Sequence, residues 1–115
     1  MTLLFVLTAA LSASHPAIPA SIRGEWDLVG HCKVPADGSD SRVIVRATEV
    51  VFVETVFTPR RVLVGAVQNW TARGEFNVEG EVSRGRLNLR LSRDGNSLAY
   101  TNWDKRVVTL VRCRR

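Results

Sequence analysis

The side chains that can do chemistry in this 115-residue chain are few and lie apart in the sequence. His31 adjoins Cys32, and a protonated imidazole beside a thiol lowers the pKa of the thiol and favours the reactive thiolate. Glu75, Glu79 and Glu81 share one face if their segment is extended, because side chains alternate along a strand. Paired carboxylates can act as general acid and base. These two groups are the candidates for catalysis.

Neither group predicts an enzyme. The chain has two histidines, and His15 falls in a segment interpreted below as a leader. The sequence contains no nucleophile elbow, no phosphate-binding glycine loop and no metal-spaced set of Cys and His. The three carboxylates are typical of a solvated strand face. His31 is interpreted as an exposed histidine beside a disulfide. We therefore expect no catalytic residue, no metal and no cofactor.

Three tryptophans and a net charge of +5 indicate binding instead. Trp70 and Trp103 sit among polar neighbours, near Arg73 and Lys105, and exposed aromatics beside cations are typical contact residues. We predict a ligand site at Trp70, Arg73, Tyr100, Trp103 and Lys105, with the cations favouring an anionic group. The alternatives are that the tryptophans are partly buried at the ends of the fold, and that the basic surface only keeps the domain soluble.

Residues 3–11 form the most continuously apolar stretch of the chain. They are too few to span a bilayer, which takes roughly 20 residues, but they match the apolar core of a secretory signal peptide. Small residues follow, so cleavage is expected after Ser12, Ser14 or Ala20. This interpretation divides the chain into a signal peptide, residues 1–20, and one domain, residues 21–115.

An exported domain limits the choice of partner. Every charged residue lies from Arg23 onward, so the domain carries the whole basic excess. We expect a periplasmic or secreted protein without a transmembrane segment in its mature form. Its partner would be a small molecule, an anionic surface or an extracellular protein, because export removes the usual nucleic-acid partners. If residues 3–11 are instead a buried first strand or helix, the protein is cytosolic and its basic surface indicates oligonucleotide binding.

The two cysteines fit an oxidising compartment. Cys32 lies near the start of the domain and Cys113 near its end. Two cysteines so far apart, with one nearby histidine, make a poor metal-binding set. We predict a Cys32–Cys113 disulfide, which would close a loop of about 80 residues and contribute up to about 4.5 kcal/mol to the free energy of unfolding.

The elements that must position these residues follow from the hydrophobic pattern. Short apolar runs rich in Val, Leu and aromatics alternate with turn signals, and no segment keeps a helical period. The pattern predicts an all-β fold, a small antiparallel up-and-down barrel of about eight strands, because an open sheet would expose its edges. The candidate strands cover residues 25–29, 43–46, 49–53, 61–64, 68–73 and 105–113, together with the three strands of a meander over residues 76–101.

Two turn signals set the expected register of a three-stranded meander over residues 76–101. If Arg84 and Gly85 form a two-residue turn, Val82 lies opposite Leu87, and the apolar residues of both strands share one face. Asp94-Gly95 is a strong signal for a type I′ hairpin turn. It predicts two further opposed pairs, Leu91 with Leu98 and Leu89 with Tyr100.

The start of the domain resembles a known family. Gly24-Glu25-Trp26 is similar to the Gly-x-Trp opening of lipocalins, calycins and their short bacterial lipocalin-like relatives, and residues 73–80 and 107–112 resemble later stretches of those relatives. The resemblance implies that Gly24 and Trp26 begin the first strand, where Trp26 plugs one end of a barrel. It also implies that Arg112 packs across Trp26.

The family includes both ligand carriers and inhibitors of proteases and lysozymes, and the fold does not select among them. The leading hypothesis is an exported, non-enzymatic binding protein that contacts a small or anionic ligand at a barrel mouth. A second is a secreted inhibitor or interaction module that acts on an extracellular protein through the loop at residues 34–41. A third is a basic oligonucleotide-binding barrel.

Overall fold

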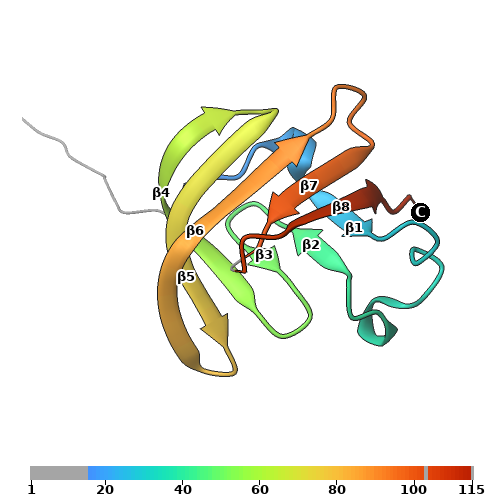
Figure 1. Ribbon diagram of the computed structural model, residues 1–115, viewed down its shortest axis with the longest axis horizontal. Helices are drawn as coiled ribbons and strands as arrows, with labels where there is room; N and C mark the ends of the chain where they lie inside the picture. Colours follow the sequence, from blue (N-terminus) through green and yellow to red (C-terminus); the bar gives the residue numbers. More distant parts are fainter. Residues whose placement is uncertain (1–15, 103, 115) are drawn as a thin grey trace, which may run out of the picture.

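The computed structural model describes residues 16–102 and 104–114. Eight strands form one closed antiparallel barrel in which each strand pairs with the next and the last pairs with the first (Figure 1). The predicted all-β barrel is therefore confirmed. The strands are β1 (Gly24–Asp27), β2 (Val43–Val45), β3 (Val50–Val51), β4 (Val56–Ala66), β5 (Asn69–Val78), β6 (Glu81–Leu91), β7 (Ser97–Thr101) and β8 (Val107–Arg112).

Every strand contributes apolar side chains to the interior. Even-numbered residues of β5 and odd-numbered residues of β6 point inward, as the period of two in an extended strand requires. Burial of one large apolar side chain contributes roughly 1.5–3 kcal/mol, so this interior is the main source of stability. The fully buried large side chains of the strands are Trp26, Val43, Val45, Val50, Phe57, Trp70, Leu87, Leu89, Leu98 and Leu110.

The barrel closes where β1 meets β8, at Trp26 and Arg112. The Arg112 guanidinium lies 4.2 Å from the centre of the Trp26 ring, a cation–π geometry. It donates hydrogen bonds to the carbonyl oxygens of Gly95, Arg23 and Ser21 at 3.0, 3.0 and 2.8 Å. Arg112 thus has the position over Trp26 that the family resemblance implies.

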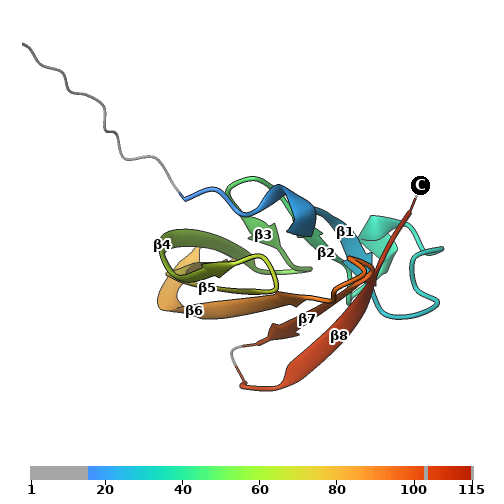
Figure 2. The ribbon, with the colours of Figure 1, turned by 90° about the horizontal axis from the view of Figure 1, so that it is seen from above.

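The segment before β1 belongs to the folded unit. Ile18 and Ile22 are fully buried, and Ile22 lies in a short 3-10 helix, η1 (Ala20–Ile22). The Ile18 amide donates to the carbonyl of Ala47 at 2.7 Å, which places this segment beside the β2–β3 connection (Figure 2). Ile18 lies before the expected domain start at residue 21. Residues 1–15 of the expected signal peptide lie outside the described residues.

Helices are a minor part of this fold. The second 3-10 helix, η2 (Ala36–Gly38), lies in the long connection between β1 and β2. Over residues 16–102 and 104–114, the chain forms no helix with the length and apolar character needed to cross a membrane.

The β5–β6 hairpin turns at Glu79 and Gly80, so the prediction that Arg84 and Gly85 form this turn is wrong. Both turn residues have a positive φ, 53° and 94°, as a two-residue type I′ turn requires. Asn77 Oδ1 accepts a hydrogen bond from the Gly80 amide at 2.8 Å. Arg84 and Gly85 lie inside β6 instead.

A close contact explains why glycines stand opposite each other within these two strands. Gly74 of β5 pairs with Gly85 of β6, and a Cβ on Gly85 would lie 3.0 Å from the Phe76 ring. These glycines let the Phe76 and Phe57 rings pack at 4.7 Å between centroids. Gly85 therefore serves ring packing rather than chain reversal.

The second expected hairpin is confirmed in register. Leu91 faces Leu98 and Leu89 faces Tyr100 across β6 and β7. The loop has four residues rather than the expected two. The Ser92 amide donates to the Ser97 carbonyl at 2.9 Å, which leaves residues 93–96 as the loop, with Asp94 and Gly95 at its centre. A two-residue and a four-residue loop centred on the same two positions give the same register.

Strands β4, β5 and β6 are much longer than the strands beside them. Only Val56 and Phe57 of β4 pair with β3, and β7 pairs only with residues 88–91 of β6. Residues 81–87 of β6 therefore have no strand partner on the β7 side among the described residues. We call this segment the free edge of β6.

We predict that Gly74→Ala destabilises the barrel by at least about 2 kcal/mol, because the added Cβ would overlap the Thr58 carbonyl and lie 2.9 Å from the Phe57 ring. Gly65→Ala is the matched control, since its Cβ would lie 3.6 Å from Val62, an ordinary contact. Urea unfolding followed by tryptophan fluorescence measures both. Equal midpoints for the two variants would contradict this packing.

Candidate functional site

A cavity of about 1000 Å³ lies beside the free edge of β6. It is bounded by the β5–β6 hairpin on one side and by the β3–β4 and β7–β8 connections on the other. Small-molecule sites typically have volumes of about 300–1000 Å³. The described lining consists of Glu54, Thr55, Asn69, Thr71, Phe76, Val78, Ser83, Arg84, Gly85, Arg86, Asn88, Thr101, Asn102 and Lys105.

The cavity combines an apolar floor with a positive rim. Phe76 and Val78 are inward-facing residues of β5, where the packed interior of the barrel ends. The charged lining residues are three cations and one carboxylate: Arg84, Arg86, Lys105 and Glu54. A ligand with an apolar body and an anionic group matches this combination, because guanidinium and ammonium groups form charge-assisted hydrogen bonds with anions.

The β7–β8 connection holds Lys105 at this rim. Asn102 Oδ1 accepts hydrogen bonds from the amides of Asp104 and Arg106, both at 2.9 Å. The Lys105 amide donates to the Asn102 carbonyl at 2.9 Å, and Lys105 has a positive φ of 66°. A tight turn organised by an asparagine side chain thus fixes the backbone that carries this cation.

An amide network supports another part of the lining. Asn88 Nδ2 donates to Asn69 Oδ1 and Thr71 Oγ1, each at 2.8 Å, and reaches the Trp70 carbonyl at 3.2 Å. These polar side chains come from β5 and β6 next to the point where β7 ends. They give the cavity hydrogen-bonding groups whose geometry is already set.

A smaller cavity of about 210 Å³ adjoins the first, and Glu54 and Thr55 line both. Tyr100 lies on its wall, half-buried and 5.2 Å from Phe52 between ring centroids. Burial raises the pKa of the Tyr100 hydroxyl above its ordinary value. Tyr100 is therefore a neutral hydrogen-bonding group near neutral pH.

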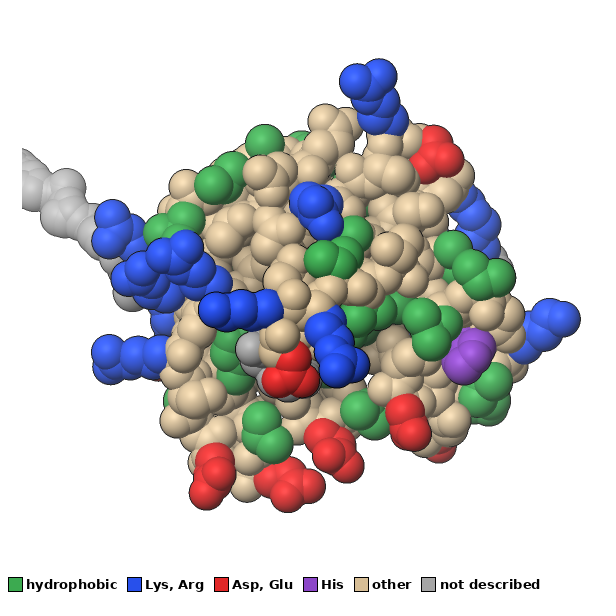
Figure 3. Space-filling model, in the orientation of Figure 1, with side chains coloured by type: hydrophobic (Ala, Val, Ile, Leu, Met, Phe, Trp, Pro, Cys, Tyr) green, Lys and Arg blue, Asp and Glu red, His purple; other side chains and the backbone are tan. Residues whose placement is uncertain are grey.

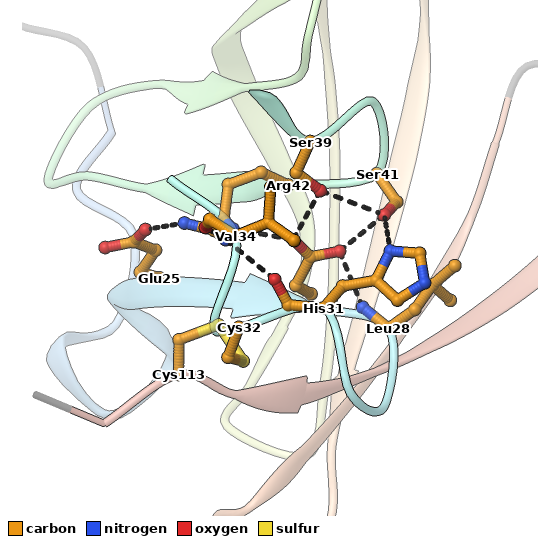
Figure 4. The surroundings of a disulfide bond; sticks show 10 residues. Glu25, Leu28, His31, Cys32, Val34, Ser39, Ser41, Arg42 and Cys113 are labelled. Carbon is orange, nitrogen blue, oxygen red and sulfur yellow. Dashed lines mark hydrogen bonds and ion pairs between the residues drawn. A yellow bond between two sulfur atoms is a disulfide. The ribbon is translucent and has the colours of Figure 1, made fainter. Parts of the chain in front are cut away.

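The long β1–β2 connection is anchored by a buried carboxylate, Asp27. Figure 4 shows Ser39, Ser41 and Arg42, which bond to it. Asp27 is fully buried at the end of β1. It accepts hydrogen bonds from Ser39 Oγ at 2.6 Å, Ser41 Oγ at 2.5 Å, Arg42 Nε at 2.7 Å and the Leu28 amide at 2.7 Å. Burial alone would raise the pKa of Asp27, but these four donors outweigh it and lower the pKa to about 2.

Arg42 connects the same carboxylate to the loop. Its guanidinium is almost fully buried and pairs with both Asp27 and Glu25. Its Nη2 donates to the carbonyl oxygens of His31 at 3.1 Å and Val34 at 2.5 Å. One buried cation therefore holds the loop backbone against the barrel wall.

The predicted disulfide between Cys32 and Cys113 is confirmed. It joins this loop to the residue after β8, with 5.3 Å between the two Cα atoms. No free cysteine occurs in the described chain, so His31 has no thiol to activate. His31 is exposed, and its Nδ1 lies 3.4 Å from Ser41 Oγ.

The structure brings only part of the predicted ligand site together. Lys105 lines the larger cavity and Tyr100 the smaller. Trp70 is not an exposed contact residue: it is 1% exposed in the core, because even positions of β5 point inward. Arg73, at an odd position, is exposed on the outer face and lines neither cavity, although its register partner Arg86 lines the larger one. Trp103 lies outside the described residues.

Sequence reasoning missed the cations and apolar groups that the hairpin contributes. Arg84 and Arg86 line the cavity because β6 begins at Glu81, whereas a turn at Arg84 would have removed both from the strand. The signal was present in Glu79-Gly80, a pair able to adopt the two positive φ angles of a tight turn. The alternation of apolar residues fits a turn at Glu79-Gly80 and a turn at Arg84-Gly85 equally well, so it gave no reason to prefer the first.

The carboxylates Glu75, Glu79 and Glu81 do not lie together on one strand face. Glu75 pairs with Arg60 at 2.8 Å on the outer face, Glu79 lies in the turn and Glu81 begins the next strand. Such exposed pairs contribute only about 0–1 kcal/mol. In the part of the chain that the structure describes, no group of three His, Cys, Asp or Glu side chains is placed to hold a metal ion.

Comparisons with protein-family models, with curated proteins and with solved structures gave no match to this chain. The sequence resemblance to lipocalin-like proteins thus has no support from these comparisons, and the structure supports the coarser statement, a small eight-stranded antiparallel barrel.

We predict that Asp27 makes stability depend on acid pH. Its pKa is lower in the folded state, about 2, than the ordinary value of 3.8, so its contribution is present above about pH 4 and is lost as the pH falls toward 2. The loss is on the order of 2 kcal/mol. Urea unfolding at several pH values between 5 and 2 measures it.

Ser39→Ala with Ser41→Ala removes two of the donors that lower this pKa, so the double variant should lose less stability over the same pH range. Asp37→Asn, in the exposed η2 segment, is the control and should keep the full dependence. An unchanged dependence in the serine variant would contradict the role assigned to Asp27.

Proposed function

We propose that this protein is an exported, non-enzymatic binding protein that takes a ligand with an anionic group in the cavity beside β6. The observation that carries the proposal is the combination of an apolar floor, Phe76 and Val78, with three rim cations against one carboxylate. The described lining contains no His and no Cys, so Ser83, its one serine, has no histidine in the lining to activate it. These groups suit recognition better than covalent chemistry.

The lipocalin-like assignment is part of this proposal. Its support is the closed barrel together with the placement of Trp26 at the closure point, where its indole nitrogen donates to the Ile22 carbonyl at 3.0 Å. Arg112 covers the other side of the ring. Barrels of eight strands are just wide enough to be filled by side chains or to hold one small ligand. Here the larger cavity lies beside β6 and is lined both by Phe76 and Val78, at inward positions of β5, and by outward positions such as Thr71 and Asn88.

A second candidate function is an inhibitor or interaction module that uses the β1–β2 connection. The observation in its favour is the anchoring of that loop by Arg42 and the Cys32–Cys113 bridge. Val29 is 78% exposed and Val34 37%, so the anchored loop presents apolar side chains to solvent. A loop already held in one conformation loses less entropy when it binds.

Export is proposed from the apolar stretch at residues 3–11 and from the disulfide, which persists in oxidising compartments. We predict that the full-length sequence, expressed in a secretion-competent bacterium, yields a chain that starts at residue 13 or 15 and gains two hydrogens on reduction. Intact mass with and without reductant measures both. A start at residue 21 would contradict the inclusion of Ile18 in the folded unit, and a full-length mass with free thiols would contradict export.

For the ligand site, we predict saturable binding of 1-anilinonaphthalene-8-sulfonate, an apolar aromatic with one anionic group, at one site per chain. Lys105→Gln with Arg84→Gln should weaken it about tenfold or more, because each lost charge-assisted hydrogen bond contributes on the order of 1.5 kcal/mol. Fluorescence titration measures the affinity, and the uncharged parent compound without the sulfonate should bind more weakly.

Lys33→Gln with Arg93→Gln is the matched control, since it removes two exposed cations that do not line the cavity. The control should bind the sulfonate as the unmodified protein does. Equal weakening in both double variants would show that net charge, rather than the cavity, determines binding, and would contradict the proposed site.

A further inference from the structure

The β4–β5 hairpin ends in an exposed apolar segment. Residues 62–72 contain no charged residue, although 23% of the whole chain is charged. Within this stretch Leu63, Val64 and Val67 are 37%, 41% and 43% exposed, and Gly65 and Ala66 between them are also exposed. We call residues 62–68 the hairpin end. Contiguous exposed apolar side chains mark interaction sites, whereas scattered ones do not.

Three arginines cross the outer face of the sheet next to the hairpin end. Arg61 of β4 pairs in register with Arg73 of β5, which pairs with Arg86 of β6. All three are exposed, and neighbouring strands lie only about 4.8 Å apart. We call them the arginine row. Lys and Arg side chains gather over this part of the surface in Figure 3.

The arginine row is unfavourable in the isolated protein. Like charges directly opposite each other across a sheet repel, and the structure gives none of the three an ion pair with a described carboxylate. The nearest carboxylate on this face, Glu75, pairs with Arg60. An anionic partner would remove this repulsion, so the charges are complementary to such a partner.

The hairpin end and the arginine row form one surface. Arg61 lies two residues before Leu63, and Arg73 follows Trp70 on the returning strand. At about 3.3 Å per residue, Arg61 lies roughly 7–10 Å along the strand from Leu63 and Val64, whereas Arg73 lies about 20 Å from Val67. The acidic turn residue Glu79 lies at the other end of β5, about 20 Å from Arg73 by the same rise. The hairpin therefore carries its cations between an apolar end and an acidic end.

We propose that the β4–β5 hairpin docks on an anionic phospholipid bilayer. The hairpin end enters the boundary between headgroups and acyl chains, and the arginine row contacts lipid phosphates. Peripheral membrane segments combine buried apolar side chains with attraction to anionic lipid in this way. A soluble anionic polymer would satisfy the arginines but would leave Leu63, Val64 and Val67 in water. The bilayer is therefore the partner that explains both features.

Cosedimentation with vesicles tests this proposal. The processed protein should bind vesicles that contain phosphatidylglycerol and should not bind vesicles of phosphatidylcholine alone. Arg61→Gln with Arg73→Gln should weaken the partition coefficient about 25-fold, because each cation near an anionic surface contributes on the order of a fivefold change. Leu63→Ser with Val67→Ser should weaken it several-fold through lost apolar contact.

Matched controls test whether the position of the substituted residues matters, rather than only the charge or apolar area that is removed. Arg46→Gln with Arg93→Gln removes the same charge elsewhere, and Val53→Ser with Val107→Ser removes two exposed valines outside the hairpin. Both controls should bind vesicles as the unmodified protein does. The four substituted hairpin residues line neither cavity, so sulfonate binding should persist in those variants. Failure of vesicle binding is therefore distinguishable from failure of the proposed ligand site.

Three results would overturn the proposal. Equal effects of the hairpin variants and their controls would show that the location of these residues is irrelevant. Loss in the arginine variant alone, with equal affinity for dextran sulfate, would indicate a soluble anionic polymer. Concentration-dependent association that the Leu63 and Val67 substitutions abolish, without vesicle binding, would indicate that a second copy of this chain covers the hairpin end.

Discussion

Closure of the barrel depends on the contact between Trp26 and Arg112. The two side chains lie where the first strand meets the last, and the short β1 offers only a few backbone pairs to hold that junction. Arg112 compensates by stacking on the indole ring and by donating to three carbonyl groups from two segments, residues 21–23 and the β6–β7 turn. Because a guanidinium presents several donors in one plane, a single side chain can satisfy them all. Ile18 and Ile22 are buried in the same core as Trp26, whose indole nitrogen donates to the Ile22 carbonyl.

The proposed ligand and membrane sites both lie on the longest strands. β4, β5 and β6 extend past their neighbours, so their side chains meet solvent in three distinct settings. The free edge of β6 borders the cavity, the outer face carries the arginine row, and the hairpin end is apolar. The opposite connection, between β1 and β2, is constrained differently, by a buried ion pair and a disulfide. One small barrel thereby carries several surfaces, and Arg86 belongs to two of them, the cavity lining and the arginine row.

Sequence reasoning succeeded where two independent signals agreed. Asp94-Gly95 marks a turn, and the apolar residues on both sides alternate about the same centre, so Leu91 had to face Leu98. It failed where alternation was the only guide. A turn at Glu79-Gly80 and one at Arg84-Gly85 both place Phe76, Leu87 and Leu89 on the inner face. With either turn, even-numbered residues of the first strand pair with odd-numbered residues of the second. For Trp70, polar neighbours suggested exposure, yet its even position in β5 buries it.

The sequence by itself determined the class of fold, the pairing of its two cysteines and the positive charge of the domain. These follow from composition, period and count, which need no knowledge of which strands are neighbours. Only the tertiary structure decided the register of β5 against β6, and with it the alignment of Arg61, Arg73 and Arg86 and the position of Arg84 at the cavity. The physical reason is that a period of two fixes the face of a residue but not its partner. The partner is set by positive φ angles at Glu79 and Gly80 and by ring packing over Gly74 and Gly85.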